Sequence, residues 1–201
     1  MDTPADEGRR DARARERILD AAEQLFAAHG FDGTATARIA KAAAVPKGLL
    51  FYYFPAKSDL LQALFDERLQ PWVVEPEELA HRGDPVASLM DISQMVFDHH
   101  DGSAILRTIL WREAHTRADA RAAAHRYRSM LQQTIADVLA ASVIDPVKDT
   151  VLHAAAATWT TIMTSRPLDN HSESGLPVTA NLRAIAELIA RGLHAPQPAT
   201  P

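Results

Sequence analysis

Apolar side chains recur three and four positions apart along nearly the whole chain, which places them on one face of a helix. The alternation of apolar and polar residues that marks a strand is missing. The sequence therefore predicts an all-α fold. Turns, loops and helix-breaking residues separate the expected helices, which lie at about residues 11–28, 36–42, 46–54, 58–69, 85–99, 103–116, 119–142, 147–165 and 178–193.

Composition places the chain among ordinary globular proteins, with 47% hydrophobic and 23% charged residues. The absence of cysteine excludes disulfide scaffolds, thiolate zinc sites and cysteine nucleophiles. The first ten residues are polar and charged, unlike a secretory signal, and the apolar run at residues 152–163 is too short to span a bilayer. We therefore expect a cytoplasmic protein with no membrane partner.

The net charge of −5 hides an asymmetry along the chain. Residues 9–57 hold nine basic and five acidic side chains, whereas the chain from residue 58 onward holds twelve basic and eighteen acidic ones. A small basic unit joined to a larger acidic body is a recurring pattern in DNA-binding regulators. The alternative is that this split arose by chance in a soluble protein.

Residues 36–54 combine a short helix, a tight turn and a second short helix, which is the spacing of a helix-turn-helix. Four aromatic residues stand consecutively at 51–54, and one helix cannot bury four successive side chains on a single face. An outward tyrosine can bind a phosphate or a base edge. The alternative is that Tyr52 and Tyr53 pack on neighbouring helices.

The first turn of the second short helix contains Lys47 and Gly48. Free backbone N–H groups and the helix dipole favour a phosphate at such a position. Lys57 stands in a similar place before the following helix.

One run of about 50 residues matches a known motif: Arg17-Ile18-Leu19-Asp20-Ala21-Ala22, Leu25-Phe26, Gly30-Phe31, Ile39-Ala40, Val45-Pro46-Lys47-Gly48, Leu50-Phe51-Tyr52-Tyr53-Phe54 and Lys57-Ser58-Asp59-Leu60-Leu61. It resembles the TetR (tetracycline-repressor-like) family. The resemblance implies an N-terminal three-helix helix-turn-helix domain, at residues 12–72, and a larger C-terminal helical ligand-binding and dimerisation domain, at residues 73–195. It also implies a homodimeric repressor that binds a pseudo-palindromic operator and releases this double-stranded DNA when a small-molecule effector binds.

Carried over by position, the resemblance implies these DNA-binding residues: Thr36, Lys47, Gly48, Leu49, Tyr52, Tyr53 and Lys57. Four positions depart from the family pattern. Ala44 replaces a turn glycine, Pro46 a serine, Leu49 a polar residue and Phe51 a tyrosine. A left-handed Ala44 would cost about 1–2 kcal/mol, and Leu49 can touch a thymine methyl but cannot hydrogen-bond a base.

The last two expected helices carry broad, alanine-rich apolar stripes. The resemblance implies that they form a four-helix dimer interface, and the alternative is that they pack only on their own core. The candidate interface residues are Val151, Ala155, Thr158, Trp159, Ile162, Leu182, Ile185 and Ile189.

The C-terminal body also holds the internal methionines and a mixed polar and aromatic helix face, which together favour a largely apolar ligand cavity. Taken singly, each of these residue types is more often plain core. The candidate pocket residues are Met90, Met95, Thr108, Trp111, His115, Tyr127, Met130 and Met163.

Motifs of catalysis are missing from the sequence, including HExxH, GxSxG and phosphate-cradling glycine loops. We therefore expect no enzymatic activity, cofactor or metal. Two alternatives stay open: a helical ligand-binding dimer whose DNA reader has decayed, and a metal-dependent protein that uses His99, His100 and His115.

Overall fold

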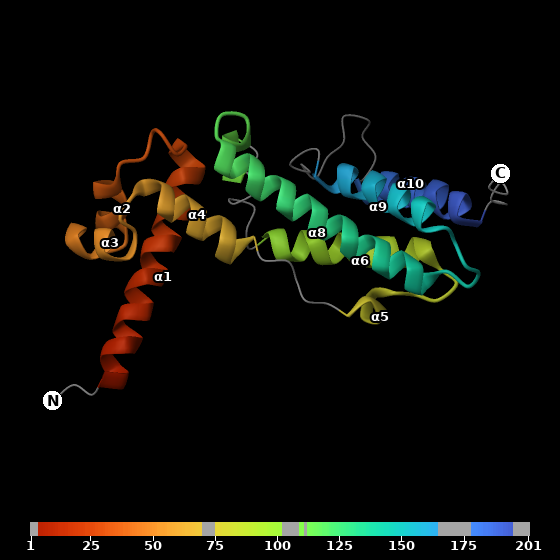
Figure 1. The fold of residues 1–201 in the computed structure, drawn as a ribbon, viewed down its shortest axis with the longest axis horizontal. Helices are drawn as coiled ribbons and strands as arrows, with labels where there is room; N and C mark the ends of the chain where they lie inside the picture. Colours follow the sequence, from red (N-terminus) through yellow and green to blue (C-terminus); the bar gives the residue numbers. More distant parts are fainter. Residues whose placement is uncertain (1–3, 70–74, 102–108, 111, 165–177, 195–201) are drawn as a thin grey trace. The chain divides into compact units, whose positions relative to one another are not determined.

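A computed structural model of the chain describes residues 4–69, 75–101, 109–110, 112–164 and 178–194. The ordered elements are all helices, which confirms the predicted fold class (Figure 1). Their bounds are α1 Pro4–His29, α2 Thr36–Ala42, α3 Lys47–Tyr53, α4 Lys57–Arg68, α5 Pro76–Leu79, α6 Pro85–Asp101, α8 Ala118–Ser142, α9 Asp149–Thr164 and α10 Val178–His194.

The chain forms two compact units that each combine separate stretches of sequence. The first unit comprises residues 1–70 and 103–126, and the second comprises residues 71–102 and 127–201. Residues near position 113 therefore belong with the helix-turn-helix region, although the sequence analysis placed them in the C-terminal body.

Helix α1 forms because an apolar stripe with Ile18, Ala22 and Phe26 is completely buried in the first unit. It ends at Gly30, whose positive φ of 77° suits glycine and whose N–H donates to the Phe26 carbonyl at 2.8 Å. The helix begins at Pro4 instead of near residue 11, because proline is compatible with a first helical turn.

The start of helix α2 has no side-chain cap. Its N-cap residue is Ala35, which makes no side-chain cap hydrogen bond. The Thr34 hydroxyl is buried and donates back to the Gly30 carbonyl at 2.7 Å, so it stabilises the α1–α2 turn instead.

The second unit contains α5, α6, α9, α10 and most of α8. Helix α10 packs against α6 and α9 through buried Leu182, Ala186 and Leu193. The Gly83 N–H donates to the Ser142 carbonyl at 2.7 Å, which ties the turn before α6 to the end of α8. Among the described residues, no helix is long and apolar enough to cross a membrane.

Candidate nucleic-acid interface

The short helix α3 presents a mixed surface because only part of it packs against the first unit. Leu50 and Phe54 are buried, whereas Tyr52 is 74% exposed and Phe51 37% exposed. Tyr53 is half-buried and lies edge-on to Tyr52, with 5.1 Å between the ring centroids. As predicted, the consecutive aromatic residues divide between the core and the surface.

The start of α3 is open to an approaching molecule. Lys47 and Gly48 are exposed, and a Cβ atom added at Gly48 would meet nothing within 4 Å. No intramolecular contact therefore explains the glycine, while its lack of a side chain leaves the first-turn N–H groups accessible. Pro46 is the N-cap residue rather than the first helical residue, one position from the prediction.

The turn between α2 and α3 keeps a left-handed residue without a glycine. Ala44 has a φ of +51°. The Val45 N–H donates to the Ala40 carbonyl at 3.0 Å, and the Ala44 N–H donates to the Lys41 carbonyl at 3.2 Å. The turn geometry is therefore retained at the cost of backbone strain, as the sequence analysis anticipated.

The α2–α3 segment carries only basic charged residues, whereas the supporting helices α1 and α4 carry both acidic and basic ones. No acidic residue occurs from Gly33 to Ser58, and this segment carries Arg38, Lys41, Lys47 and Lys57. Arg38 and Lys41 are exposed, and neither forms an ion pair within the described part of the chain. Neither Arg38 nor Lys41 is among the predicted DNA-binding residues; the run of sequence without acidic residues is the signal that points to them.

The acids of α1 and α4 are largely engaged in ion pairs of their own. Arg15 forms a bidentate pair with Glu67, and its guanidinium lowers the pKa of that carboxyl. Arg68 binds both Glu16 and Asp20, the latter at 2.7 Å. These pairs neutralise part of the charge on the supporting helices, whereas Arg38, Lys41 and Lys47 form no ion pair within the described part of the chain.

Besides the predicted phosphate contact, Lys57 has partners within its own chain that the sequence did not reveal. Its ammonium group donates to the carbonyls of Phe31, at 2.9 Å, and Thr34, at 3.2 Å. It also lies 4.3 Å from the centre of the Phe31 ring. Lys57 therefore stabilises the α1–α2 turn, and its contact with phosphate stays a prediction.

Residues 112–117 complete the packing around this turn. Arg112 donates to the carbonyls of Phe26 and Ala27 at the end of α1, the latter at 3.1 Å. The Arg117 guanidinium lies 4.0 Å from the centre of the Phe31 ring. Because cations at a helix C-terminus interact favourably with its dipole, these contacts fix the end of α1.

The predicted ligand-pocket residues do not form one set in the structure. Met163 and Tyr127 are buried in the second unit. Met90, Met95 and Met130 belong to the same unit and are half-buried. His115 is exposed and belongs to the first unit, whereas the other described candidates belong to the second. Thr108 and Trp111 lie outside the described residues.

Two of the predicted dimer-interface residues belong to the core of their own chain. Trp159 and Leu182 are buried, because they fall on the inward faces of α9 and α10. Thr158 is exposed, whereas the other five candidates are half-buried. Leu188, which the sequence analysis did not select, is a large exposed apolar residue on α10.

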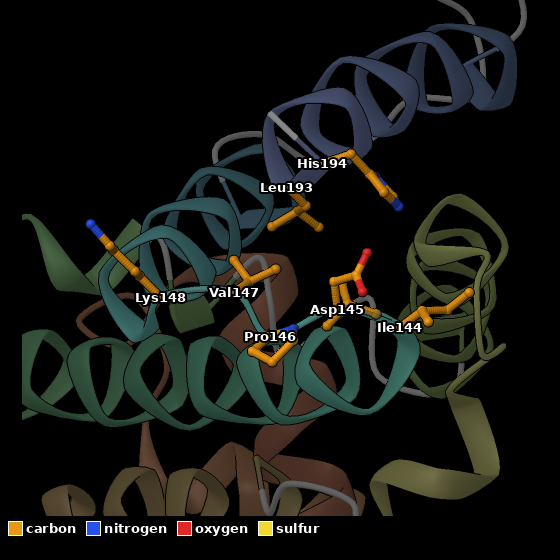
Figure 2. A pocket seen from close by; sticks show the side chains of 8 residues that line it. Ile144, Asp145, Pro146, Val147, Lys148, Leu193 and His194 are labelled. Atoms are coloured by element: carbon orange, nitrogen blue, oxygen red, sulfur yellow. The ribbon is translucent and has the colours of Figure 1, made fainter. Parts of the chain in front are cut away.

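A cavity of about 360 Å³ lies where the α8–α9 connection meets the end of α10 (Figure 2). Its walls include Val143, Pro146, Val147 and Leu193, with Asp145 and His194 at its polar side. None of the predicted pocket residues lines it.

The proposed metal ligands cannot be compared as a group. The side chains of His99 and His100 lie outside the described residues, and His115 is exposed. Within the described ranges, no cluster of three or more histidine or acidic side chains is arranged to hold a metal ion.

Comparisons with known proteins identify the helix-turn-helix unit. Residues 18–64 match the family model described as bacterial regulatory proteins, tetR family. The A-factor receptor protein of Streptomyces griseus is 35% identical over 77 residues, covering 38% of this chain and 26% of the relative. The regulator AcrR of Shigella flexneri is 35% identical over 82 residues, covering 39% of this chain and 37% of the relative. These alignments span well under half the length of either relative.

Solved structures share the fold over most of the chain. The fatty acid degradation regulator FadR from Bacillus halodurans has a TM-score of 0.64 at 21% identity, covering 90% of this chain and 96% of that one. The regulator PfmR from Thermus thermophilus has a TM-score of 0.62 at 18% identity, with coverages of 92% and 98%.

The fold places a helix-turn-helix, formed by α2 and α3, at a basic surface whose sequence holds no acidic residue from Gly33 to Ser58. Residues 18–64 of this chain match the helix-turn-helix model of the tetR family of bacterial regulatory proteins, and this N-terminal part is similar to that family.

Proposed function

We propose that this chain is a ligand-responsive repressor that binds a pseudo-palindromic operator as a homodimer in the cytoplasm. The observation that carries the proposal is the acid-free α2–α3 surface, on which Arg38, Lys41 and Lys47 are exposed beside Tyr52. Residues 12–72 act as the reader of DNA, and residues 73–195 serve ligand binding and dimerisation.

In this proposal the start of α3 enters the major groove. The N–H groups near Lys47 and Gly48 face a phosphate, and half-buried Leu49 supplies an apolar contact for a thymine methyl. Tyr52, Tyr53, Lys57 and the start of α2 at Thr36 flank this helix and bind the backbone on either side. The hydroxyl and ammonium groups carry affinity, and the first turn of α3 carries sequence preference.

The alternative of a decayed DNA reader is less well supported. A chain that no longer bound DNA would not need to keep the left-handed turn between α2 and α3. Ala44 nevertheless has a φ of +51°, and the backbone hydrogen bonds around it are made. The surface beyond the turn also lacks acids that would repel a phosphate. Both features favour a working reader.

The exposed faces of α9 and α10 support the proposed dimer. The exposed strip of α9 includes Ala154 and Thr158, and that of α10 includes Ala184 and Leu188. Small side chains allow close helix packing, and Leu188 supplies apolar area. Two copies joined through these helices would present two α3 helices to successive half-sites of an operator.

The relatives do not identify the effector of this chain. One relative is named as an A-factor receptor and one solved neighbour was crystallised with stearoyl-CoA. The sequence matches are confined to partial alignments, and the structural likeness extends to the fold alone. The chemical class of the effector must therefore be inferred from the residues of the second unit.

Fluorescence anisotropy tests the proposal with the full-length protein, the DNA upstream of its own gene and a scrambled duplex of equal length. For about 6–10 phosphate contacts, log affinity should fall with log salt at a slope of about −5 to −9. Specific binding should exceed scrambled binding by about a thousandfold or more. A flat salt response on both duplexes would contradict a DNA reader, whereas a steep response without preference would place the operator elsewhere.

A further inference from the structure

A cavity in the second unit lies apart from the side chains that have been assigned to DNA, effector or dimer contacts. Its volume is about 360 Å³, and residues 143–148 line it together with Leu193 and His194 at the end of α10. Ligand pockets in proteins have volumes of about 300–1,000 Å³, so this cavity is large enough for a small molecule. It is a second candidate site, and its lining defines a chemistry of its own.

The walls of the cavity are mainly apolar. Figure 2 shows Leu193 of α10 and Val147 of the α8–α9 connection directed toward its centre, with Pro146 below Val147. Leu193 is buried and Val147 is half-buried. An aliphatic chain placed between these side chains is removed from water, which favours its binding.

Ile144 extends this apolar surface to the rim of the cavity. It is 65% exposed, as is Leu188, and these two are the large exposed apolar side chains among the described residues of the second unit. Leu188 belongs to the proposed dimer contact, whereas Ile144 has no role in the proposed function. An exposed apolar side chain beside a cavity adds area that a ligand can cover.

The polar side of the cavity offers hydrogen-bond acceptors. The Nδ1 atom of His194 lies 2.7 Å from the Ala190 carbonyl oxygen, and because a carbonyl only accepts, Nδ1 carries the proton. The neutral imidazole then has Nε2 as an acceptor. The carboxylate of Asp145 is a second acceptor, and Figure 2 shows it directed toward the side of the cavity that His194 borders.

The charge that faces the cavity is negative. Figure 2 shows Lys148 directed away from Asp145, so the lysine does not place its ammonium group in the cavity. Pro146 has a fixed φ, and a residue that precedes proline is restricted to an extended backbone. The backbone that carries the Asp145 carboxylate is therefore constrained before a ligand binds, which lowers the entropic cost of binding.

We propose that this cavity binds a small amine in its ammonium form, carried on a short apolar chain. The ammonium group donates to the Asp145 carboxylate and to Nε2 of His194, and the apolar chain lies against Val147 and Leu193. An ammonium has three donors and no acceptor, which matches two acceptors of which one is charged. A carboxylate ligand would meet the like charge of Asp145, and an alcohol would bring a donor without the charge. The site goes beyond the proposed function, since it requires neither DNA nor the effector.

Calorimetric titration of the full-length protein without DNA tests the class of ligand. The probes are hexylammonium, 1-hexanol and hexanoate, which have equal chain length and a positive, neutral or negative end. At low ionic strength, where charges are least screened, we expect saturable binding of hexylammonium, weaker binding of 1-hexanol and the weakest binding of hexanoate. Equal binding of the three, or no binding of hexylammonium, would overturn the proposal.

Two variants with the same change of charge test the position of the ammonium group. Asp145→Asn should weaken hexylammonium binding about three- to fivefold, the effect of losing one exposed ion pair, and should leave 1-hexanol binding unchanged. Asp137→Asn is the control, because Asp137 is an exposed acid of α8 in the same unit that does not line the cavity. Equal weakening by both variants would show attraction to the acidic unit as a whole and would overturn the site.

The apolar wall is tested by Val147→Phe, whose larger side chain fills the cavity and should abolish hexylammonium binding. The melting temperature shows whether this variant folds. Val147→Thr keeps the shape of the side chain and adds a hydroxyl, so it should fold and weaken hexylammonium binding. Unchanged binding in Val147→Thr, or in a folded Val147→Phe, would place the ligand elsewhere.

Protein concentration separates a small-molecule site from a contact with a second copy of the chain. We expect the affinity for hexylammonium to be the same at low and at high protein concentration. An affinity that falls as the protein concentration rises would show that a second copy covers Ile144 and the cavity, and would overturn the proposal.

Discussion

The backbone N–H of Phe31 donates to the carboxylate of Glu113 at 3.1 Å, although 82 residues separate them in sequence. Glu113 is only 6% exposed, and Arg112 and Arg117 on the same segment contact the same turn. This carboxylate closes the turn between α1 and α2, the turn that leads directly into the candidate DNA-binding helices.

Glu113→Ala should destabilise the first unit by about 1–3 kcal/mol, because the Phe31 N–H loses its buried acceptor. Denaturant unfolding measures the change. Glu113→Gln retains a carbonyl oxygen and should lose less stability than the alanine variant. Equal losses from the two variants would mean that the hydrogen bond is not the source of the effect.

Ala44→Gly should stabilise the protein by about 1 kcal/mol. Relief of the left-handed strain is worth about 1–2 kcal/mol, and the extra freedom of an unfolded glycine offsets about 0.4–1 kcal/mol. Ala37→Gly, on α2, is the control and should destabilise by about 1 kcal/mol. A loss of stability in Ala44→Gly would show that the left-handed turn does not persist in solution.

Lys47 and Lys57 should respond differently to replacement by alanine. Both variants should lower the magnitude of the salt slope for DNA binding by about one per half-site if each lysine holds a phosphate. Only Lys57→Ala should also lower the melting temperature, because Lys57 binds the Phe31 and Thr34 carbonyls. The control is Arg82→Ala, an exposed charge in the second unit, which should change neither quantity. An unchanged slope in Lys57→Ala would reassign this lysine to the turn alone.

Acid should weaken the folded protein through Asp119. The hydrogen bond from the Arg117 guanidinium lowers the pKa of the Asp119 carboxyl below its usual range. Because the folded pKa lies below the unfolded one, this contribution is complete above about pH 4 and is lost as the pH falls toward the folded pKa. Unfolding free energy measured from pH 7 to pH 2 should therefore fall less steeply in Asp119→Asn than in the wild type. Identical slopes would show that this ion pair does not contribute.

Local sequence signals explain why much of the helix-turn-helix unit was predictable from sequence. Gly30, the four aromatics at 51–54 and the Ala44 turn act through backbone geometry within a few residues, so the sequence indicated each of them. The partners of Lys57 and the position of Glu113 depend on packing between distant segments, and no local pattern encodes them. Trp159 shows the same limit, because an apolar stripe does not reveal whether a ring faces its own core or a second copy.

Replacement of Leu188 by glutamate tests the proposed dimer. Leu188 is 65% exposed on α10, so Leu188→Glu should leave the stability of each protomer nearly unchanged. In a dimer formed through α9 and α10, two glutamates would be buried near each other without counter-charges, which opposes association. Sedimentation analysis should then show a monomer, together with loss of high-affinity operator binding. Ile144→Glu is the matched control, since Ile144 is also 65% exposed but lies outside both helices. If Ile144→Glu dissociates the dimer and Leu188→Glu does not, the interface lies at the α8–α9 connection instead.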